Sequence, residues 1–385
     1  MTSALSVGLD YRPALANREG IGRYTRELVR ALIEAGADEG LRLFSSTFAP
    51  SRFTPQELGI SGSRARSLRW RLPSKWMPAL MRATGRGADD WLGGVGVFHH
   101  TQPNLLPVRN AREVATIFDC IYLSREGWLD EPSAERMERA AREQVRRARL
   151  LLVPTKFVAG EVVARLGAKP EQVFVTDLGC DHAARESGAG RAPAQKKEPF
   201  VLTVSRVDAR KNHVRMLAAF EQLVASGMPQ RWIVAGPRGH GFEAFETALE
   251  RSPARARVEW RHYVSELELA QLYATADVFV FASLSEGFGL PPLEAMVHGL
   301  PVVASNTTCL PEVCGDAALL VDPLDSEAIA AGLRRVLGER DFARDLAARG
   351  HLRAAKYTWS HCAQQTRAAY LCARDGATPR AVTER

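Results

Sequence analysis

The stretch SEGFGLPPLE, residues 285–294, follows a short apolar run and leads into a helical pattern, and it decides how this part of the chain folds. Gly287 and Gly289 allow the backbone to approach a ligand closely. Pro291 and Pro292 suit the first turn of a helix, whose N–H groups favour phosphate. The stretch therefore predicts a strand, a ligand-facing loop and a helix in succession.

Two carboxylates accompany this loop. Glu286 lies on the loop itself, and Glu294 lies about one turn into the predicted helix. Carboxylates accept hydrogen bonds from sugar hydroxyls without being consumed, so the pair suits two different hydroxyls of one ligand. The alternative is a glycine turn followed by a glutamate that the helix dipole favours.

A second motif, SRVDARKN at residues 205–212, directly follows the predicted strand 200–204. It places three cations, Arg206, Arg210 and Lys211, in one turn between a strand and a helix. Loops beyond the carboxyl ends of strands face the ligand crevice of an open α/β sheet, so this turn suits a diphosphate. The alternative is a solvated basic loop.

Short apolar runs alternate with amphipathic stretches along the chain, a rhythm typical of parallel strands joined by crossover helices and therefore of the α/β class. The predicted strands are residues 5–9, 41–44, 95–98, 114–118 and 150–153 in the first half, and 200–204, 232–235, 258–260, 278–281, 302–304 and 318–321 in the second. At 385 residues the chain exceeds the roughly 250–300 residues of a single core, so two domains are expected.

Composition excludes several classes of protein. Hydrophobic residues make up 46% and charged residues 25%, as in ordinary globular proteins. No segment supplies the ~20 apolar residues of a membrane span, and residues 1–10 lack the pattern of a signal peptide. The six cysteines form no C-x-x-C pair, which indicates reduced thiols. We therefore expect a cytoplasmic protein.

Within a net charge of +7, positive charge gathers in residues 58–88, which contain no acid. The cations of this segment are Arg64, Arg66, Arg69, Arg71, Lys75, Arg82 and Arg86. They are interleaved with Trp70 and Trp76, a mixture that suits the anionic lipid of the inner face of the cell membrane. The alternative is a solvated loop and helix with ordinary packing. No zinc-finger or RNA-binding signature points to nucleic acid.

Several motifs together resemble glycosyltransferase family 4, whose members are retaining enzymes of the GT-B fold. The resemblance rests on Arg206 with Lys211, on the Glu286-x7-Glu294 spacing, on GLPVVAS and LPEVCGDAALLVDP downstream, and on GIGRYTR (20–26), VAGP (234–237), HYVS (262–265) and YTWS (357–360) in the family's order. It covers nearly the whole chain. The GIGRYTREL-like opening resembles bacterial mannosyltransferases of surface polysaccharide assembly, including lipopolysaccharide.

The resemblance implies two Rossmann-like domains that face each other across a donor-binding cleft. It implies an N-terminal acceptor domain at residues 1–185, a linker at 186–199 and a nucleotide-sugar domain at 200–357. The final helix, residues 358–385, would pack back on the first domain.

The resemblance also implies a role for each matching residue. Arg206 and Lys211 would neutralise the donor diphosphate. Glu286 would bind the transferred sugar, and Glu294 would bind the ribose. The other donor-binding residues would be Gly20, Gly22, Gly236, Tyr263, Val264, Gly287, Phe288, Gly289 and Leu290, and the acceptor-side candidates are Arg23, His99, His100, Phe118 and Asp119.

One position departs from the family. Members often carry His-Asp after the strand equivalent to residues 114–117, whereas here Phe118 precedes Asp119. Three explanations stay open. His99 or His100 supplies the missing contact, the site accepts a less polar donor sugar, or activity is reduced.

The implied reaction moves a hexose, with retained configuration, from a nucleotide diphosphate sugar to a glycan or polyprenol-linked glycan acceptor. GDP-mannose is the favoured donor, and a UDP-hexose or dTDP-rhamnose is the alternative. Two cations and a helix N-terminus can replace Mg²⁺ at the diphosphate, and the chain contains no D-x-D triplet. We therefore expect neither a metal nor a cofactor.

Two other functions compete with this one. Phe118 alone suggests a catalytically weak GT-B scaffold that binds nucleotide or a partner enzyme. A dinucleotide-dependent oxidoreductase would carry G-x-G-x-x-G between a first strand and a helix, and this chain lacks that motif.

Overall fold

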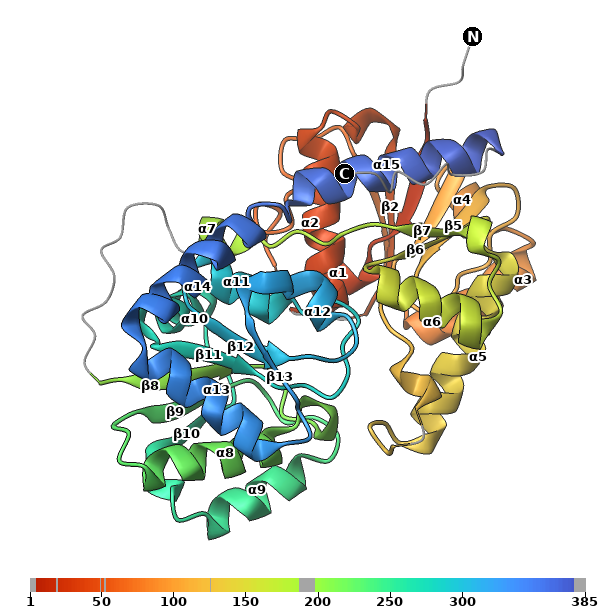
Figure 1. Ribbon diagram of the computed structural model, residues 1–385. Helices are drawn as coiled ribbons and strands as arrows, with labels where there is room; N and C mark the ends of the chain where they lie inside the picture. Colours follow the sequence, from red (N-terminus) through yellow and green to blue (C-terminus); the bar gives the residue numbers. More distant parts are fainter. Residues whose placement is uncertain are drawn as a thin grey trace. The chain divides into compact units, whose positions relative to one another are not determined.

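The computed structural model describes residues 5–376 except 19, 49, 52, 125 and 187–197 (Figure 1). Most of the linker predicted at residues 186–199 therefore lies outside the described residues. The described chain forms two compact units, each built around its own parallel sheet. The predicted α/β class with two Rossmann-like domains is confirmed.

Unit 1 comprises residues 1–120, 135–179 and 359–385, and its seven strands run in the order β3-β2-β1-β4-β5-β6-β7. The strands are β1 Val7–Asp10, β2 Leu41–Ser46, β3 Arg66–Trp70, β4 Val97–His100, β5 Arg112–Thr116, β6 Leu150–Val153 and β7 Val173–Val175. The α-helices whose residues lie mainly in this unit are α1 Arg12–Ala16, α2 Ile21–Glu34, α3 Met77–Thr84, α4 Ala88–Trp91, α5 Glu131–Arg147, α6 Lys156–Leu166 and α15 Trp359–Asp375. Short 3-10 turns are η1 Asp38–Gly40, η2 Ser74–Trp76 and η4 Pro170–Gln172.

Unit 2 comprises residues 121–134 and 180–358, and its six strands run in the order β10-β9-β8-β11-β12-β13. The strands are β8 Phe200–Val204, β9 Arg231–Ala235, β10 Val258–Arg261, β11 Val278–Phe281, β12 Val302–Ser305 and β13 Leu319–Val321. The α-helices are α7 His182–Glu186, α8 His213–Ala225, α9 Phe242–Arg251, α10 Glu266–Thr275, α11 Leu290–Val297, α12 Leu310–Cys314, α13 Ser326–Gly338 and α14 Arg340–Ala354, and the 3-10 turns are η3 Ile121–Leu123, η5 Ala209–Lys211, η6 Arg255–Arg257 and η7 Gly315–Ala317. Since all the pairings are parallel, the loops that follow β8, β11 and β12 leave the same edge of the sheet.

The core of unit 2 is centred on Trp232 of β9. Its ring lies 5.8 Å from the ring of Phe220 and 5.8 Å from that of Phe245, measured between centroids. The buried indole N–H donates a 3.0 Å hydrogen bond to Thr203 Oγ1, which removes the cost of burying an unpaired donor. This packing fixes the adjacent strands β8 and β9, and so fixes where the loop after β8 begins.

The unit boundaries differ from those predicted. Residues 180–185 group with unit 2, because the Cys180 N–H donates a 2.9 Å hydrogen bond to the Tyr357 carbonyl. Residues 121–134 also group with unit 2, so the boundary falls inside α5. The final helix, α15, packs on α2 within unit 1.

A buried hydrogen-bond chain ties α15 to the sheet of unit 1. His99 Nδ1 lies 2.7 Å from the Tyr370 hydroxyl, and His99 Nε2 lies 2.7 Å from Thr116 Oγ1. Burial, together with the nearby His100, lowers the pKa of His99 to about 3, so its imidazole is neutral. One ring nitrogen therefore donates and the other accepts.

Replacing Tyr370 with Phe should lower the free energy of unfolding by about 1–3 kcal/mol, because it leaves one nitrogen of a buried imidazole without a partner. Urea denaturation of the purified variant measures this loss. Tyr263→Phe, on a side chain that is 64% exposed, is the matched control and should change stability by less than about 0.5 kcal/mol. Equal stabilities of the two variants would show that the Tyr370 bond contributes nothing.

Candidate functional site

A buried charge cluster lies where β8 and β11 end in unit 2. Glu286 lies on the loop after β11, and its Oε1 forms an ion pair with the Lys211 ammonium group. Its Oε2 accepts a 2.9 Å hydrogen bond from Arg210 Nη1. We call these three residues the Glu286 cluster. The sequence predicted Lys211 and Glu286 as site residues, and the structure brings them into contact.

The cations of the cluster keep Glu286 ionised. Burial by itself would raise the pKa of this carboxyl, but Arg210 and Lys211 outweigh burial and lower the pKa to about 2. The carboxylate is therefore charged throughout the physiological range. A fixed arrangement of buried charges of both signs is suited to a polar, charged ligand.

Two unusual backbone positions hold this cluster in place. Asn212 adopts a left-handed conformation (φ 64°), and its side-chain amide donates to the carbonyls of Ala282 (2.9 Å) and Pro323 (2.7 Å). Thr308 is β-branched and also left-handed (φ 55°), and its Oγ1 accepts a 3.2 Å hydrogen bond from the Glu286 N–H. Such a conformation is costly for a β-branched residue and concentrates at functional sites.

Glycines allow close approach at two of the predicted donor positions. Gly289 caps α11 with a left-handed φ of 94°, and an added Cβ would come within 2.6 Å of Leu310 Cδ2. At Gly236 an added Cβ would come within 2.0 Å of the Ser205 carbonyl oxygen. Both positions therefore require glycine for packing, which is independent of any ligand.

The other residues of the SEGFGLPPLE stretch present backbone more than side chain. Gly287 is buried, and Leu290 is half-buried at the first position of α11. The Phe288 ring is buried and packs edge-on against Tyr357, with ring centroids 5.6 Å apart. Phe288 therefore anchors the loop with its side chain, and only its backbone suits ligand contact.

Glu294 lies in a second buried network. His182 Nε2 donates a 2.9 Å hydrogen bond to Glu294 Oε1, and the Tyr273 hydroxyl donates a 3.0 Å bond to Oε2. The ring of Tyr273 stacks on His298, with centroids 5.4 Å apart. These contacts fix the orientation of a carboxylate that the sequence assigned to ribose binding.

The remaining candidates of unit 2 lie nearer the surface. Arg206 is exposed, and its methylenes lie against Gly239, where an added Cβ would come within 2.8 Å of Arg206 Cδ. Tyr263 is exposed and Val264 is half-buried. Arg206 therefore does not join the buried Glu286 cluster, in which Arg210 takes the position beside Lys211.

Sequence reasoning missed several residues that the structure places at these carboxylates. Arg210 was named only as one of three cations in a turn suited to a diphosphate, and its contact with Glu286 was not predicted. His182, Tyr273 and Thr308 lie far from these glutamates in the sequence, and no local motif signals them. Only the topology brings them together.

In unit 1, Gly20 caps α2, and Gly22 and Arg23 are buried in its first turn. Phe118 and Asp119 are both half-buried after β5. The Phe118 ring packs edge-on against Tyr24, with centroids 4.9 Å apart. The position where the family often has histidine is thus filled by an aromatic packing contact.

The hypothesis that His99 or His100 supplies the missing polar contact is wrong for this structure. Both imidazoles are fully buried. His99 bonds Tyr370 and Thr116, and His100 Nε2 lies 2.8 Å from Glu113 Oε2. Residues on the central strand β4 point into the core, so neither ring reaches solvent.

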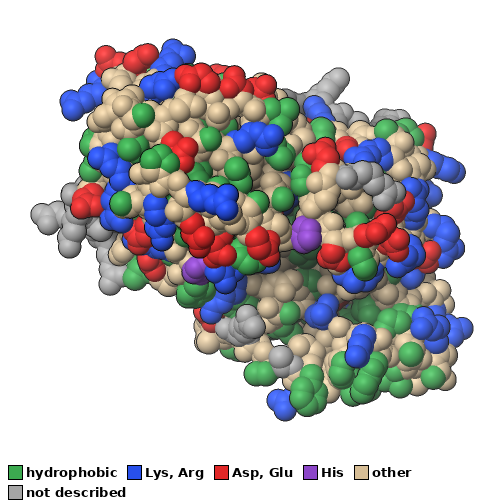
Figure 2. All heavy atoms as spheres, turned by 90° about the horizontal axis from the view of Figure 1, so that it is seen from below, with side chains coloured by type: hydrophobic (Ala, Val, Ile, Leu, Met, Phe, Trp, Pro, Cys, Tyr) green, Lys and Arg blue, Asp and Glu red, His purple; other side chains and the backbone are tan. Residues whose placement is uncertain are grey.

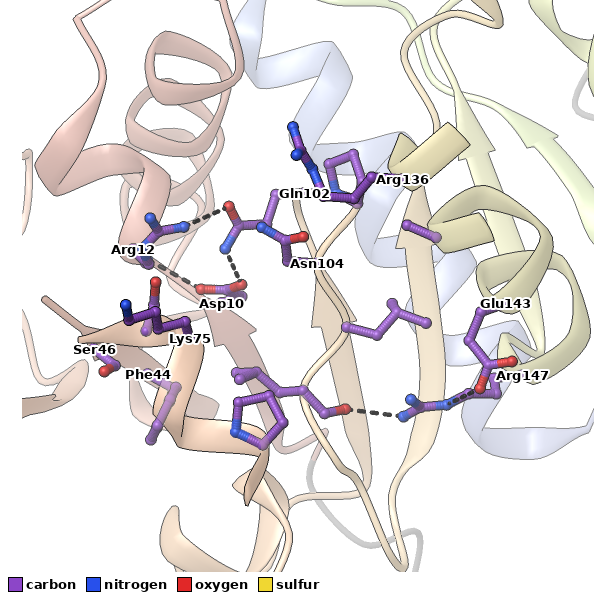
Figure 3. A pocket seen from close by; sticks show the side chains of 16 residues that line it. Asp10, Arg12, Phe44, Ser46, Lys75, Gln102, Asn104, Arg136, Glu143 and Arg147 are labelled. Carbon is purple, nitrogen blue, oxygen red and sulfur yellow. Dashed lines mark hydrogen bonds and ion pairs between the residues drawn. The ribbon is translucent and has the colours of Figure 1, made fainter. Parts of the chain in front are cut away.

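Unit 1 also contains a cavity of about 500 Å³ at the carboxyl ends of β1, β2 and β4 (Figure 3). We call it the unit 1 pocket. Asp10, only 2% exposed, accepts a 2.6 Å hydrogen bond from Gln102 Nε2 and a 3.2 Å bond from the Arg12 N–H. Arg12 Nη1 in turn donates a 3.2 Å bond to Gln102 Oε1. Sequence reasoning named none of these residues.

Two further properties concern only the described residues. Within them, no group of three or more His, Cys, Asp or Glu side chains could hold a metal ion. Among the helices that these residues form, none has the length and apolar character needed to cross a bilayer.

Comparison with known proteins places the chain in a class. A family profile described as "Glycosyl transferases group 1" matches residues 187–353. Among solved structures, sucrose-phosphate synthase from Thermosynechococcus elongatus superposes with a TM-score of 0.73 at 21% identity, covering 97% of this chain and 100% of that one. WaaG, a glycosyltransferase involved in lipopolysaccharide biosynthesis, superposes with a TM-score of 0.69 at 17% identity, covering 94% and 98%. At these identities the two structures show the fold, which is GT-B.

The curated relatives define the family. O-antigen chain mannosyltransferase B of Escherichia coli is 32% identical over 366 residues, covering 91% of this chain and 95% of that protein. The chain therefore belongs to the glycosyl transferases of group 1 and is a glycosyltransferase.

Acid should reveal the contribution of the Glu286 cluster to stability. The folded pKa of Glu286, about 2, lies below its ordinary value of 4.5. Its contribution is therefore complete above pH 4.5 and is lost as the pH falls toward 2. We expect wild type to lose about 1–2 kcal/mol more unfolding free energy between pH 5 and pH 3 than Glu286→Gln does. Urea denaturation at each pH measures both, and parallel losses would contradict the assigned ion pairs.

Proposed function

We propose that this protein is a retaining glycosyltransferase that moves a hexose from a nucleotide diphosphate sugar to a glycan or polyprenol-linked glycan acceptor. The observation that carries the proposal is the buried Glu286 cluster, at the loop edge of a parallel sheet in a chain of this family. GDP-mannose is the favoured donor, and the similarity to O-antigen chain mannosyltransferase B of Escherichia coli supports mannose. A UDP-hexose and dTDP-rhamnose are the alternative donors.

The proposed chemistry follows the development of charge. Breaking the bond between sugar and phosphate builds positive charge at the anomeric carbon and negative charge on the departing diphosphate. Lys211 and Arg206 would neutralise the diphosphate, and Arg210 is a third cation in the same loop. Preorganised donors in a water-poor site lower such a barrier efficiently.

The two glutamates would hold the donor. Glu286 would accept hydrogen bonds from hydroxyls of the transferred sugar, and Glu294 would accept them from the ribose. Backbone around Tyr263 and Val264 would face the base, with Gly236 as a further donor-binding position of unit 2. The acceptor would attack from the face that the diphosphate leaves, and a donor oxygen would take its proton.

A catalytically weak scaffold is the second candidate, because Phe118 packs on Tyr24 where the family often has histidine. The intact Glu286 cluster favours an enzyme over a scaffold. Turnover separates the two functions, since a scaffold would bind nucleotide without releasing it from any donor.

Replacing Lys211 with Gln should reduce the release of GDP from GDP-mannose by about 10²–10³-fold, because the variant loses one charged group at the developing negative charge. Lys169→Gln, at an exposed lysine of unit 1, is the matched control and should keep wild-type turnover.

A thermal-shift panel of GDP, UDP and dTDP identifies the nucleotide, because binding to the folded state raises the unfolding temperature. Nucleotide binding by wild type without turnover, whatever the acceptor, would favour the scaffold.

For the segment 58–88 we propose contact with anionic lipid at the inner face of the cell membrane. Arg66, Arg71, Lys75, Arg82 and Arg86 are exposed, and the described residues offer them no ion-pair partner. Trp76 is 57% exposed beside them. On the face seen from below, Figure 2 shows Lys and Arg side chains among hydrophobic ones, with Asp and Glu side chains on the same face.

Part of the segment has an ordinary structural role. Met77 and Met81 are fully buried in the core against Phe44 and Phe98. Arg64 pairs with Asp38 and Glu39, so it is not available for lipid. Fewer residues of segment 58–88 are therefore available to lipid than the sequence suggested.

Neutralising Arg66, Arg71, Arg82 and Arg86 together with Gln should remove most binding to vesicles rich in anionic lipid, because each cation contributes about 1 kcal/mol near such a surface. Vesicle co-sedimentation measures the change. Replacing four exposed arginines of unit 2 (Arg215, Arg238, Arg251 and Arg255) with Gln matches the change in net charge and should leave most binding intact. Equal binding by the two variants would remove the proposal.

A further inference from the structure

The acids of the unit 1 pocket are already satisfied by the protein. Asp10 accepts hydrogen bonds from Gln102 and from the Arg12 N–H. Glu143 accepts bonds of 2.6 Å and 2.8 Å from Arg146. Neither carboxylate therefore needs a ligand to complete its hydrogen bonding.

The cations of the pocket have fewer partners than its carboxylates have. Arg147 binds Glu113 and the Leu106 carbonyl, so its charge is compensated. The guanidinium of Arg12 donates to the neutral side chain of Gln102, and Lys75 has no hydrogen-bond or ion-pair partner among the residues described. Arg12 also lies in the field of the Asp10 carboxylate, so Lys75 carries the uncompensated charge, and both cations leave unused donors at the cavity, on the same side in Figure 3.

The rest of the wall suits a sugar ring. Apolar surface from Pro78, Leu105 and Ala140 lies beside the neutral polar groups of Ser46 and Asn104. A cavity of this size, with a few polar groups on a largely apolar wall, is typical of a small-ligand site. A guanidinium fork and an ammonium group are the usual protein partners of phosphate.

We propose that the unit 1 pocket binds a saccharide that carries a phosphate, with Arg12 and Lys75 contacting the phosphate. The inference rests on the proposed function in one respect, which is that the saccharide is part of the acceptor. None of the acceptor-side candidates from the sequence lines this pocket.

The phosphate has two sources to distinguish. Lys75 and Pro78 line the pocket, and Trp76 between them is exposed within the segment proposed to meet lipid. A phosphate that joins a saccharide to a polyprenol would therefore lie at the lipid surface. A soluble phosphorylated glycan would present the same chemistry.

The test is calorimetric titration of full-length protein with mannose 1-phosphate, in saturating GDP so that any nucleotide site is filled. Wild type should bind mannose 1-phosphate at least about tenfold more tightly than mannose. The double variant Arg12→Gln with Lys75→Gln should lose about tenfold or more in affinity for mannose 1-phosphate. Thermal unfolding of each variant checks that it folds.

The matched control is Arg112→Gln with Lys169→Gln, which removes one arginine and one lysine from exposed positions of unit 1 outside the pocket. It should bind mannose 1-phosphate within about twofold of wild type, since distant exposed charges are screened. Equal loss in the two double variants, or equal affinity of wild type for mannose and mannose 1-phosphate, would overturn the proposal.

Displacement of the bound sugar phosphate identifies the source. Displacement by phosphatidylcholine vesicles carrying polyprenyl phosphate, but not by plain vesicles, supports the pocket and assigns the phosphate to a lipid. No displacement by either also supports the pocket and assigns a soluble sugar phosphate. GDP binding is read separately by thermal shift, so failure of the nucleotide site and failure of the pocket are distinguishable.

Discussion

A carboxylate held between two cations is the interaction on which the organisation of unit 2 depends. Glu286 cannot be buried as a charged group unless opposite charges accompany it, because desolvation of an isolated ion costs far more than a domain's net stability. Arg210 and Lys211 supply those charges from the loop after β8. The parallel sheet brings the two loops to the same edge, and the Asn212 amide joins them through the carbonyl of Ala282. Sheet topology and charge balance therefore support each other.

The sequence predicted most of the architecture because its signals are local. Buried parallel strands appear as short apolar runs, and β8, β9, β11 and β12 were all predicted close to their observed bounds. Strands β3 and β7 were missed. The sequence of β3, RSLRW, mixes charged and apolar residues at the edge of the sheet, and so it looked like part of a basic loop.

The site was predictable to a smaller extent, for a physical reason. Lys211, Glu286 and Glu294 stand in motifs whose spacing follows from one strand, one loop and one helix. His182 contacts Glu294 although the two lie 112 positions apart in the sequence, and Thr308 contacts Glu286 at a separation of 22 positions. No local pattern carries such contacts. The burial of His99 and His100 was likewise set by the position of β4 between β1 and β5.

The packing of α15 on unit 1 has a consequence for the order in which the protein is made. Unit 1 contains residues from the start of the chain, from its middle and from its last helix, whereas unit 2 ends at residue 358. A ribosome releases the chain from its N-terminus onward, so every residue of unit 2 emerges before α15 does. Unit 1 therefore begins to be synthesised before unit 2 but is completed after it. The face of α2 that α15 covers stays uncovered until α15 has been synthesised.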